Sequence, residues 1–214
     1  MLARGPWSPD QVVARWLEEE YVSPADLTAS ADSAIEALAE RGSPSHDGLG
    51  ARFVSHAAVD DGILEINLQP ARWSLRLNEA DAANSVAALC AVRDSEGRWL
   101  AGRRAQWLAS WPGRWALGAG GAVDLGESPA DTLARELDEE WAVTAEELRG
   151  EALVMLPNSM VMFIGQAWLA EGAEVTRDDE HDDHAWWPAA IDQWPQEADE
   201  PLRRMATLLS EIPR

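Results

Sequence analysis

One acidic segment in the second half of the chain constrains this protein most, because it predicts a helix that gathers negative charge on one face. Ser128 is suited to cap a helix, and Pro129 suits the first helical position. Glu136, Glu139 and Glu140 fall at positions i, i+3 and i+4, which places three carboxylates side by side. Carboxylates at this spacing repel by roughly 0.2–0.5 kcal/mol per pair, so the face favours a bound cation. Hard oxygen ligands of this kind suit Mg²⁺ or Mn²⁺, ions that commonly serve phosphate chemistry.

The same segment also indicates which side of the helix is buried. The helix is expected to begin directly after Glu127, and its apolar residues recur every three or four positions. These residues are Ala130, Leu133, Leu137 and Trp141. The glutamates therefore project from a face next to the buried stripe.

Net charge narrows the classes of partner. The chain of 214 residues has 38 acidic and 17 basic residues, for a formal net charge of −21, and every basic residue is an arginine. Duplex nucleic acid and anionic membrane surfaces both require a basic footprint, so neither is an expected partner. A small phosphorylated substrate remains compatible with this charge, because a bound divalent cation reverses the local field.

Cysteine content and hydropathy point to a cytoplasmic protein. Cys90 is the single cysteine, so no intramolecular disulfide can form and a reducing compartment is expected. Residues 1–7 lack the apolar core of a signal peptide. No apolar run approaches the roughly 20 residues that a membrane span requires.

The first part of the chain is expected to form a small α+β domain. Residues 8–41 carry two Ser-Pro helix-start signals, which predict two helices. Residues 51–77 alternate polar and apolar positions, which predicts strands, with Asp60-Asp61-Gly62 as a hairpin turn. We place a domain boundary near residue 82, so that residues 1–82 form the N-terminal domain.

The second expected domain, residues 83–214, mixes strands and helices. The expected elements besides the acidic helix are a buried central strand at 85–92, a strand at 98–104, one or two strands within 152–170, an acidic loop at 178–183, a short strand at 185–187 and a closing helix at 201–212. This mixed order predicts an α+β fold.

Written as a pattern, the acidic segment matches a known signature. It reads Gly121, five residues, Glu127, seven residues, then Arg135-Glu136-Leu137-Asp138-Glu139-Glu140, one residue, and Ala142-Val143. It resembles the box of the Nudix hydrolases, G-x5-E-x7-R-E-U-x-E-E-x-G-U with U a bulky aliphatic residue. Only the last glycine departs from the pattern. The resemblance implies an α/β/α sandwich with a mixed sheet.

Ala142 stands where the family has that glycine, at the expected end of the helix. A glycine there implies a positive φ, in which alanine is less favourable by roughly 1 kcal/mol. The replacement removes no carboxylate, so we expect it to be tolerated.

The resemblance also implies a metal site, with Mg²⁺ as the cofactor and Mn²⁺ as an alternative. Glu139 and Glu140 would be ligands, with the carbonyl of Gly120 as another. Glu136 would be a ligand or the base that activates water. Glu127 would be an accessory acidic residue at the metal.

Two further residues of the segment have implied roles. Arg135 would orient a carboxylate without competing for the metal, because its charge is permanent. Gly121 would let the backbone approach a phosphate group. Glu136, Arg135 and Glu139 are thus the catalytic candidates, for hydrolysis of a diphosphate linkage.

An acidic loop downstream supplies two more candidates. Several Nudix enzymes carry a Glu-His pair in a similar place, which would make Glu180 a further ligand or base and His181 a substrate contact. A solvated acidic loop explains the same residues equally well. His181 and His184 lie three residues apart and also suit zinc, but they lack cysteine partners.

Four residues ahead of the acidic segment are candidate substrate contacts. Trp111 and Trp115 are placed to stack on a base or sugar, and core packing is the alternative. Arg103 and Arg104 end an expected strand and would meet phosphates, and ordinary surface charge is the alternative.

The N-terminal part adds a weaker resemblance, carried by residues 46–53 and 85–88. It is similar to a Nudix subgroup with an extra N-terminal domain that includes UDP-glucose pyrophosphatases. This implies a nucleotide sugar ahead of ADP-ribose, a dinucleotide or a nucleoside triphosphate, and a possible homodimer. The alternative function is a non-catalytic Nudix-fold sensor that binds a nucleotide.

Overall fold

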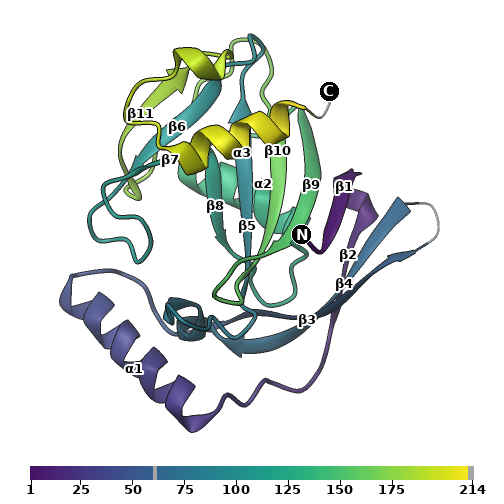
Figure 1. Ribbon diagram of the computed structural model, residues 1–214, viewed down its shortest axis with the longest axis vertical. Helices are drawn as coiled ribbons and strands as arrows, with labels where there is room; N and C mark the ends of the chain where they lie inside the picture. Colours follow the sequence, from purple (N-terminus) through teal and green to yellow (C-terminus); the bar gives the residue numbers. More distant parts are fainter. Residues whose placement is uncertain (60–61, 212–214) are drawn as a thin grey trace.

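The computed structural model describes residues 1–59 and 62–211, and these form two sheets and three α-helices (Figure 1). The elements are β1 (Ala3–Trp7), β2 (Val12–Trp16), α1 (Ala25–Glu40), β3 (Leu49–Val59), β4 (Ile63–Arg72), β5 (Val86–Arg93), β6 (Trp99–Arg104), β7 (Trp115–Leu117), β8 (Ala119–Ala122), α2 (Pro129–Trp141), β9 (Glu147–Met155), β10 (Val161–Trp168), β11 (His181–Trp187) and α3 (Glu200–Ser210). Short 3₁₀ helices accompany them, at η1 (Pro9–Gln11), η3 (Trp73–Leu77) and η4 (Ile191–Gln193).

The larger sheet is mixed and places β5 at its centre. Its order is β1-β9-β10-β5-β6-β11, with β7 paired to β6 and β8 paired to β5. The β10–β5 pair is parallel, and the other pairs are antiparallel. The central strand predicted at 85–92 is confirmed, because β5 is an apolar run buried on both faces.

Helices cover both faces of this sheet. Alternate residues of β5 pack against different helices: Cys90 shares a core cluster with Leu133 of α2, and Ala91 shares another with Leu202 of α3. Figure 1 shows α3 crossing the front of the sheet and α2 behind it. The predicted α/β/α sandwich is confirmed.

The segment before the sandwich corrects one prediction. Residues 12–16 form strand β2 in place of the first expected helix, although the helix-start signal at Ser8 does form a capping box on η1. β2 pairs in parallel with β4, and this nonlocal pairing prevents the helix from continuing beyond the short turn η1. The second expected helix is confirmed as α1.

Two other expectations are also adjusted. Residues 73–77 form η3 in place of the end of a strand, because β4 stops at Arg72. β11 begins at His181, so the expected acidic loop is shorter and the strand longer. In the predicted turn Asp60-Asp61-Gly62, the first two residues lie outside the described residues.

The N-terminal segment packs directly on the sandwich. β1 pairs with β9 in the larger sheet, and Phe53 of β3 belongs to the same core cluster as Leu133. The Trp16 Nε1 donates to the carbonyl of Glu127 at 3.0 Å. The boundary near residue 82 stays a prediction. Within the described part of the chain, no helix is long and apolar enough to cross a membrane.

Candidate active site

Helix α2 begins where the sequence predicts. The Ser128 Oγ accepts from the Asp131 N–H at 3.2 Å, and Asp131 accepts from the Ser128 N–H at 2.8 Å. This reciprocal pair satisfies two backbone donors that a helix start would otherwise leave free. The predicted apolar stripe, from Ala130 to Trp141, is buried, and this fixes the direction in which the acidic face points.

The helix ends at Ala142, which has a φ of 51° and a ψ of 42°. The predicted positive φ is therefore confirmed. A Cβ in this left-handed conformation costs about 1 kcal/mol, and the Ala142 N–H still donates to the carbonyl of Asp138 at 2.9 Å.

Ala142→Gly is therefore expected to stabilise the protein by about 0.5–1 kcal/mol, since glycine removes the strain at this φ. Urea unfolding followed by circular dichroism measures the change. Ala134→Gly is the matched control, because Ala134 is an exposed residue in the middle of the same helix. That control should lose about 1 kcal/mol, and equal losses in both variants would contradict the prediction.

Arg135 connects the carboxylates of this face. Its guanidinium donates to Glu127 Oε1 at 2.8 Å, to Glu136 Oε1 at 2.7 Å and to Glu139 Oε2 at 2.8 Å. It also donates to the backbone carbonyl of Ala122 at 3.0 Å. The same arginine thus holds three glutamates and ties the helix to the end of β8.

Glu136 and Glu140 are the buried members of the face. Burial raises the pKa of Glu140 well above its usual value, and Glu136 and Glu180 add to this effect. Burial also raises the pKa of Glu136, although Arg135 opposes it. The Gly120 N–H donates to Glu140 Oε1 at 3.0 Å. In this arrangement two adjacent carboxylates resist ionisation unless a cation joins them.

The geometry of the acidic face accounts for the glycine at position 121. A Cβ at this position would overlap the carboxylate of Glu136, so any other residue would displace that carboxylate from its place beside Arg135. Glycine at this position therefore keeps space for the Glu136 carboxylate beside β8.

Glu180 and His181 lie beside Glu140, at the start of β11. The His181 side chain is 1% exposed, and its Nε2 lies 3.6 Å from Glu140 Oε2. Its Nδ1 lies 3.3 Å from Asp178, and its ring lies 4.5 Å from the Trp141 ring. A side chain so enclosed packs against Glu140 and is closed to solvent. This does not fit the predicted direct contact between His181 and substrate.

Half-buried Glu180 joins the same acidic group. Burial raises its pKa, and the charge of Arg104 acts in the opposite direction. Among the described residues, no three His, Cys, Asp or Glu side chains converge closely enough to hold a metal ion on their own.

The two arginines at the end of β6 point to opposite faces of the sheet, because side chains alternate along a strand. Arg104 acts on Glu140 and Glu180 and donates to the Ser110 carbonyl at 2.9 Å. Arg103 pairs across the sheet with Trp115, whose ring packs 5.5 Å from Trp187 on the α3 side. The structure therefore brings Arg104 to the carboxylates and leaves Arg103 on the other face.

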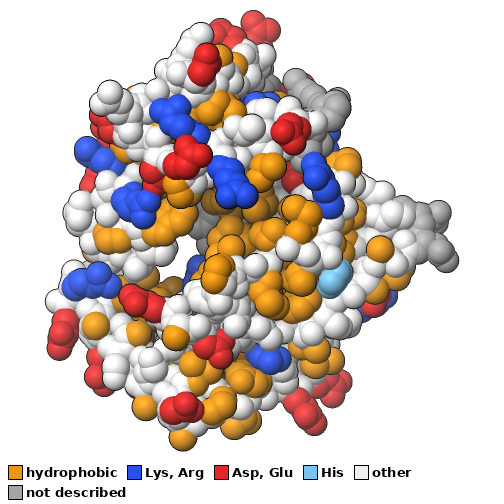
Figure 2. Space-filling model, viewed as in Figure 1, with side chains coloured by type: hydrophobic (Ala, Val, Ile, Leu, Met, Phe, Trp, Pro, Cys, Tyr) orange, Lys and Arg blue, Asp and Glu red, His pale blue; other side chains and the backbone are white. Residues whose placement is uncertain are grey.

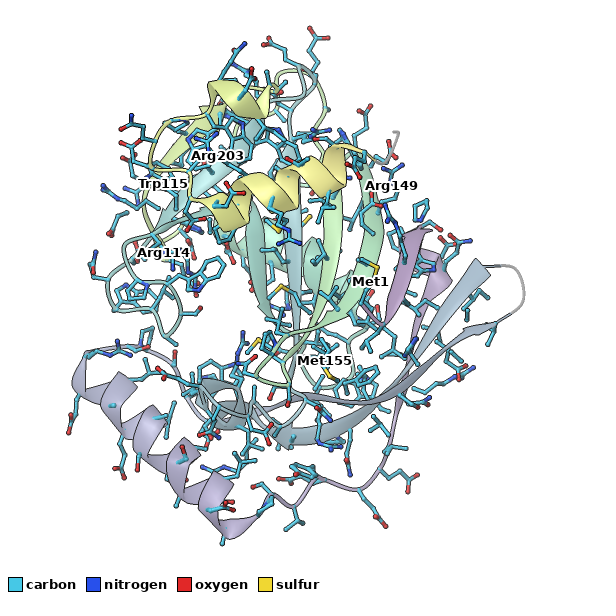
Figure 3. The ribbon with its side chains drawn as sticks, in the orientation of Figure 1. Met1, Arg114, Trp115, Arg149, Met155 and Arg203 are labelled. Atoms are coloured by element: carbon cyan, nitrogen blue, oxygen red, sulfur yellow. The ribbon has the colours of Figure 1, made fainter. Side chains whose placement is uncertain are left out.

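Arg103 and Trp115 line a separate open hollow of about 470 Å³ with Arg114 and Asp199. Arg114 forms an ion pair with Asp199, and Figure 3 shows Arg114 and Trp115 beside the N-terminal end of α3. Trp111 is 49% exposed, with the Arg114 guanidinium 5.2 Å from its ring centre. Predicted contacts between these tryptophans and the metal-site substrate gain no support from this placement.

The structure also adds a residue that sequence reasoning missed. Burial lowers the pKa of Arg76 in η3, and the charges of Glu136 and Glu180 oppose this effect. Arg76 lies 45 positions before Gly121 in the chain. An isolated arginine in a short turn carries no signal of such a location, and only the tertiary fold brings it there.

Comparison with known proteins identifies the family. A model of the NUDIX domain matches residues 83–205, which is more than half of the chain. An uncharacterized Nudix hydrolase of Pseudomonas aeruginosa is 45% identical over 56 residues, which make up 26% of this chain. The matched stretch covers 33% of that curated relative.

Solved structures with similar folds include several Nudix proteins. The MutT protein of Methanosarcina mazei Go1 is 20% identical, with a TM-score of 0.46 over 60% of this chain and 96% of that one. The NUDIX domain of Shewanella oneidensis NrtR, complexed with ADP ribose, is 19% identical, with a TM-score of 0.47 over 64% and 92%. The match to the domain model settles membership: the chain belongs to the Nudix family.

Proposed function

We propose that this protein is a Mg²⁺-dependent Nudix pyrophosphohydrolase. Its reaction would be hydrolysis of a diphosphate linkage in a nucleoside diphosphate joined to another moiety. The observation that carries this proposal is the pair of buried carboxylates, Glu136 and Glu140, beside Gly120 and Gly121. Two buried carboxylates this close together repel each other when both are ionised. A divalent cation bound between them would neutralise this repulsion.

The residues of this chain fit such a metal. Mg²⁺ takes one or two protein carboxylates and completes its shell with waters and substrate phosphates, so a set of three protein ligands is not required. We assign Glu136 and Glu140 as ligands, with the Gly120 carbonyl and Glu180 as further oxygen donors. When bound, the metal would polarise a phosphoryl oxygen and lower the pKa of a water.

Other residues act on water and on orientation. Glu139 is the most exposed of the three helix glutamates, with 57% of its side chain accessible, so it is placed to accept a proton from water. Arg135 holds Glu139 and Glu127 in position through its fork of donors. His181 keeps Glu140 in place from behind. Arg104 is the candidate phosphate contact on this face.

The substrate assignment rests on the N-terminal resemblance alone. We rank nucleotide sugars slightly ahead of ADP-ribose, dinucleotides and nucleoside triphosphates. A cytoplasmic location and a homodimer remain predictions. The alternative, a nucleotide-binding sensor without catalysis, is the weaker candidate because all three helix glutamates and Arg135 are present.

A substrate screen with Mg²⁺, scoring released phosphate and nucleotide, tests the proposal. At least one nucleoside diphosphate derivative should be cleaved at its diphosphate bond, and EDTA should lower the rate by more than about 100-fold, since the cation supplies several kcal/mol of charge stabilisation. Added Mg²⁺ should restore the rate. Binding of these ligands with no turnover would favour the sensor, and turnover that EDTA leaves unchanged would overturn the metal assignment.

A further inference from the structure

A basic side chain from outside the matched NUDIX domain reaches the acidic face. Arg76 belongs to η3, whereas the domain match begins at residue 83. It lines a small cavity of about 10 Å³ together with Trp73, Ser85 and Ala122. Ala122 is the residue whose carbonyl accepts from Arg135, and it follows the glycine that abuts Glu136. Arg76 therefore lies at the end of β8, the strand whose Gly121 abuts the carboxylate of Glu136.

The turn that carries Arg76 is anchored on both sides. The Asp47 carboxylate accepts from the Ser74 N–H at 2.9 Å, and the Trp73 N–H donates to the Gly48 carbonyl at 2.8 Å. Leu75 is fully buried in a cluster under α1. Figure 2 shows a hollow between the sandwich and the lower layer of the molecule, to which α1 belongs in Figure 1.

The guanidinium of Arg76 is half-buried and makes no hydrogen bond to a described residue. It lies 5.6 Å from the centre of the Trp73 ring, and it forms no ion pair with any residue in the described ranges. A guanidinium has five N–H donors, so those of Arg76 are available to the oxygen atoms of a ligand.

A second arginine faces the same group of carboxylates. Arg104 and Arg76 repel each other, while Glu136 and Glu180 attract Arg76. Arg104 donates to Ser110, whereas Arg76 donates to no residue in the described part of the chain. The guanidinium groups of Arg76 and Arg104 and the proposed metal together form a region of positive charge. An anion with several negative charges would neutralise it.

We propose that Arg76 is a phosphate-binding residue that grips one phosphate of a diphosphate substrate while Arg104 and the metal site take the other. This inference rests on the proposed function and extends it, because it assigns substrate recognition to the N-terminal segment. It also defines the ligand class as one with two adjacent phosphates.

Binding of methylenediphosphonate, a diphosphate mimic that is not hydrolysed, tests the proposal in the presence of Mg²⁺. By calorimetry, Arg76→Ala should raise the Kd about 10- to 100-fold, the range expected for lost charge-assisted hydrogen bonds. Arg76→Lys should bind between the two, because lysine keeps the charge and loses the planar fork. Arg41→Ala is the matched control, since Arg41 is exposed just after α1, and its Kd should stay within twofold.

The outcomes separate this inference from the proposed function. Equal Kd values for wild type and both Arg76 variants, or no binding by the wild type, would overturn the role of Arg76 in phosphate binding. This holds even if the enzyme turns over substrate. Failure of the substrate screen would overturn the proposed function, yet the binding series would still decide the role of Arg76. If Arg76→Ala does not fold, Arg76→Lys and Arg76→Gln decide, and loss of ligand-induced thermal stabilisation in a folded variant supports the assignment.

Discussion

Replacing Glu140 by glutamine is expected to lower kcat by about three orders of magnitude while the fold survives. Glutamine keeps the size of the side chain and an oxygen that accepts from the Gly120 N–H. It removes the negative charge that a divalent cation requires. Since burial of that charge raises the pKa of Glu140, its removal should leave the Tm in EDTA equal or higher.

Steady-state kinetics on the best substrate from the screen, with Mg²⁺ at saturation, measure this effect. Asp138→Asn is the matched control, because it neutralises an exposed acid on the same helix and should stay within twofold of the wild type. A Glu140→Gln enzyme with full turnover would remove Glu140 from the metal site.

Trp141→Ala is expected to lower the free energy of unfolding by about 3–5 kcal/mol, a large share of the usual 5–15. Trp141 is completely buried, and its Nε1 donates to the Gly118 carbonyl at 3.0 Å. Alanine leaves a cavity, an unsatisfied carbonyl and no support for the His181 ring. For a chain of this size the Tm should fall by roughly 6–20 °C.

Chemical denaturation and thermal scans measure this change. Trp111→Ala is the control, since that tryptophan is half exposed, and it should cost less than about 1 kcal/mol. Trp141→Phe should lie in between, because it keeps most of the ring and loses the indole donor. A loss below 1 kcal/mol for Trp141→Ala would show that the core rearranges around this position.

Helix α2 was predictable because its signals are local. The capping pair at Ser128, the proline at the first turn and the apolar stripe all act within a few residues, so they fix both ends of the helix and its buried side. The spacing of Gly121, Glu127 and Arg135 belongs to the same short segment, and it sufficed to indicate the family.

The N-terminal segment was less predictable because its outcome depends on distant partners. The capping box at Ser8 does form, but the chain then pairs with β4 some fifty residues away, and that pairing decides strand over helix. Local propensity competes weakly with a ladder of hydrogen bonds and a shared core.

The site itself divides in the same way. The sequence alone determined the carboxylates of α2, their arginine and the glycines beside them, because a helix repeat and a turn place them. Only the tertiary structure showed which of Arg103 and Arg104 faces the carboxylates, and only it placed Arg76 at the end of β8. The face of the sheet to which a side chain of β6 points depends on the register of that strand with its neighbours. Arg76 lies outside the motif, and it reaches the site only because η3 packs against the end of β8.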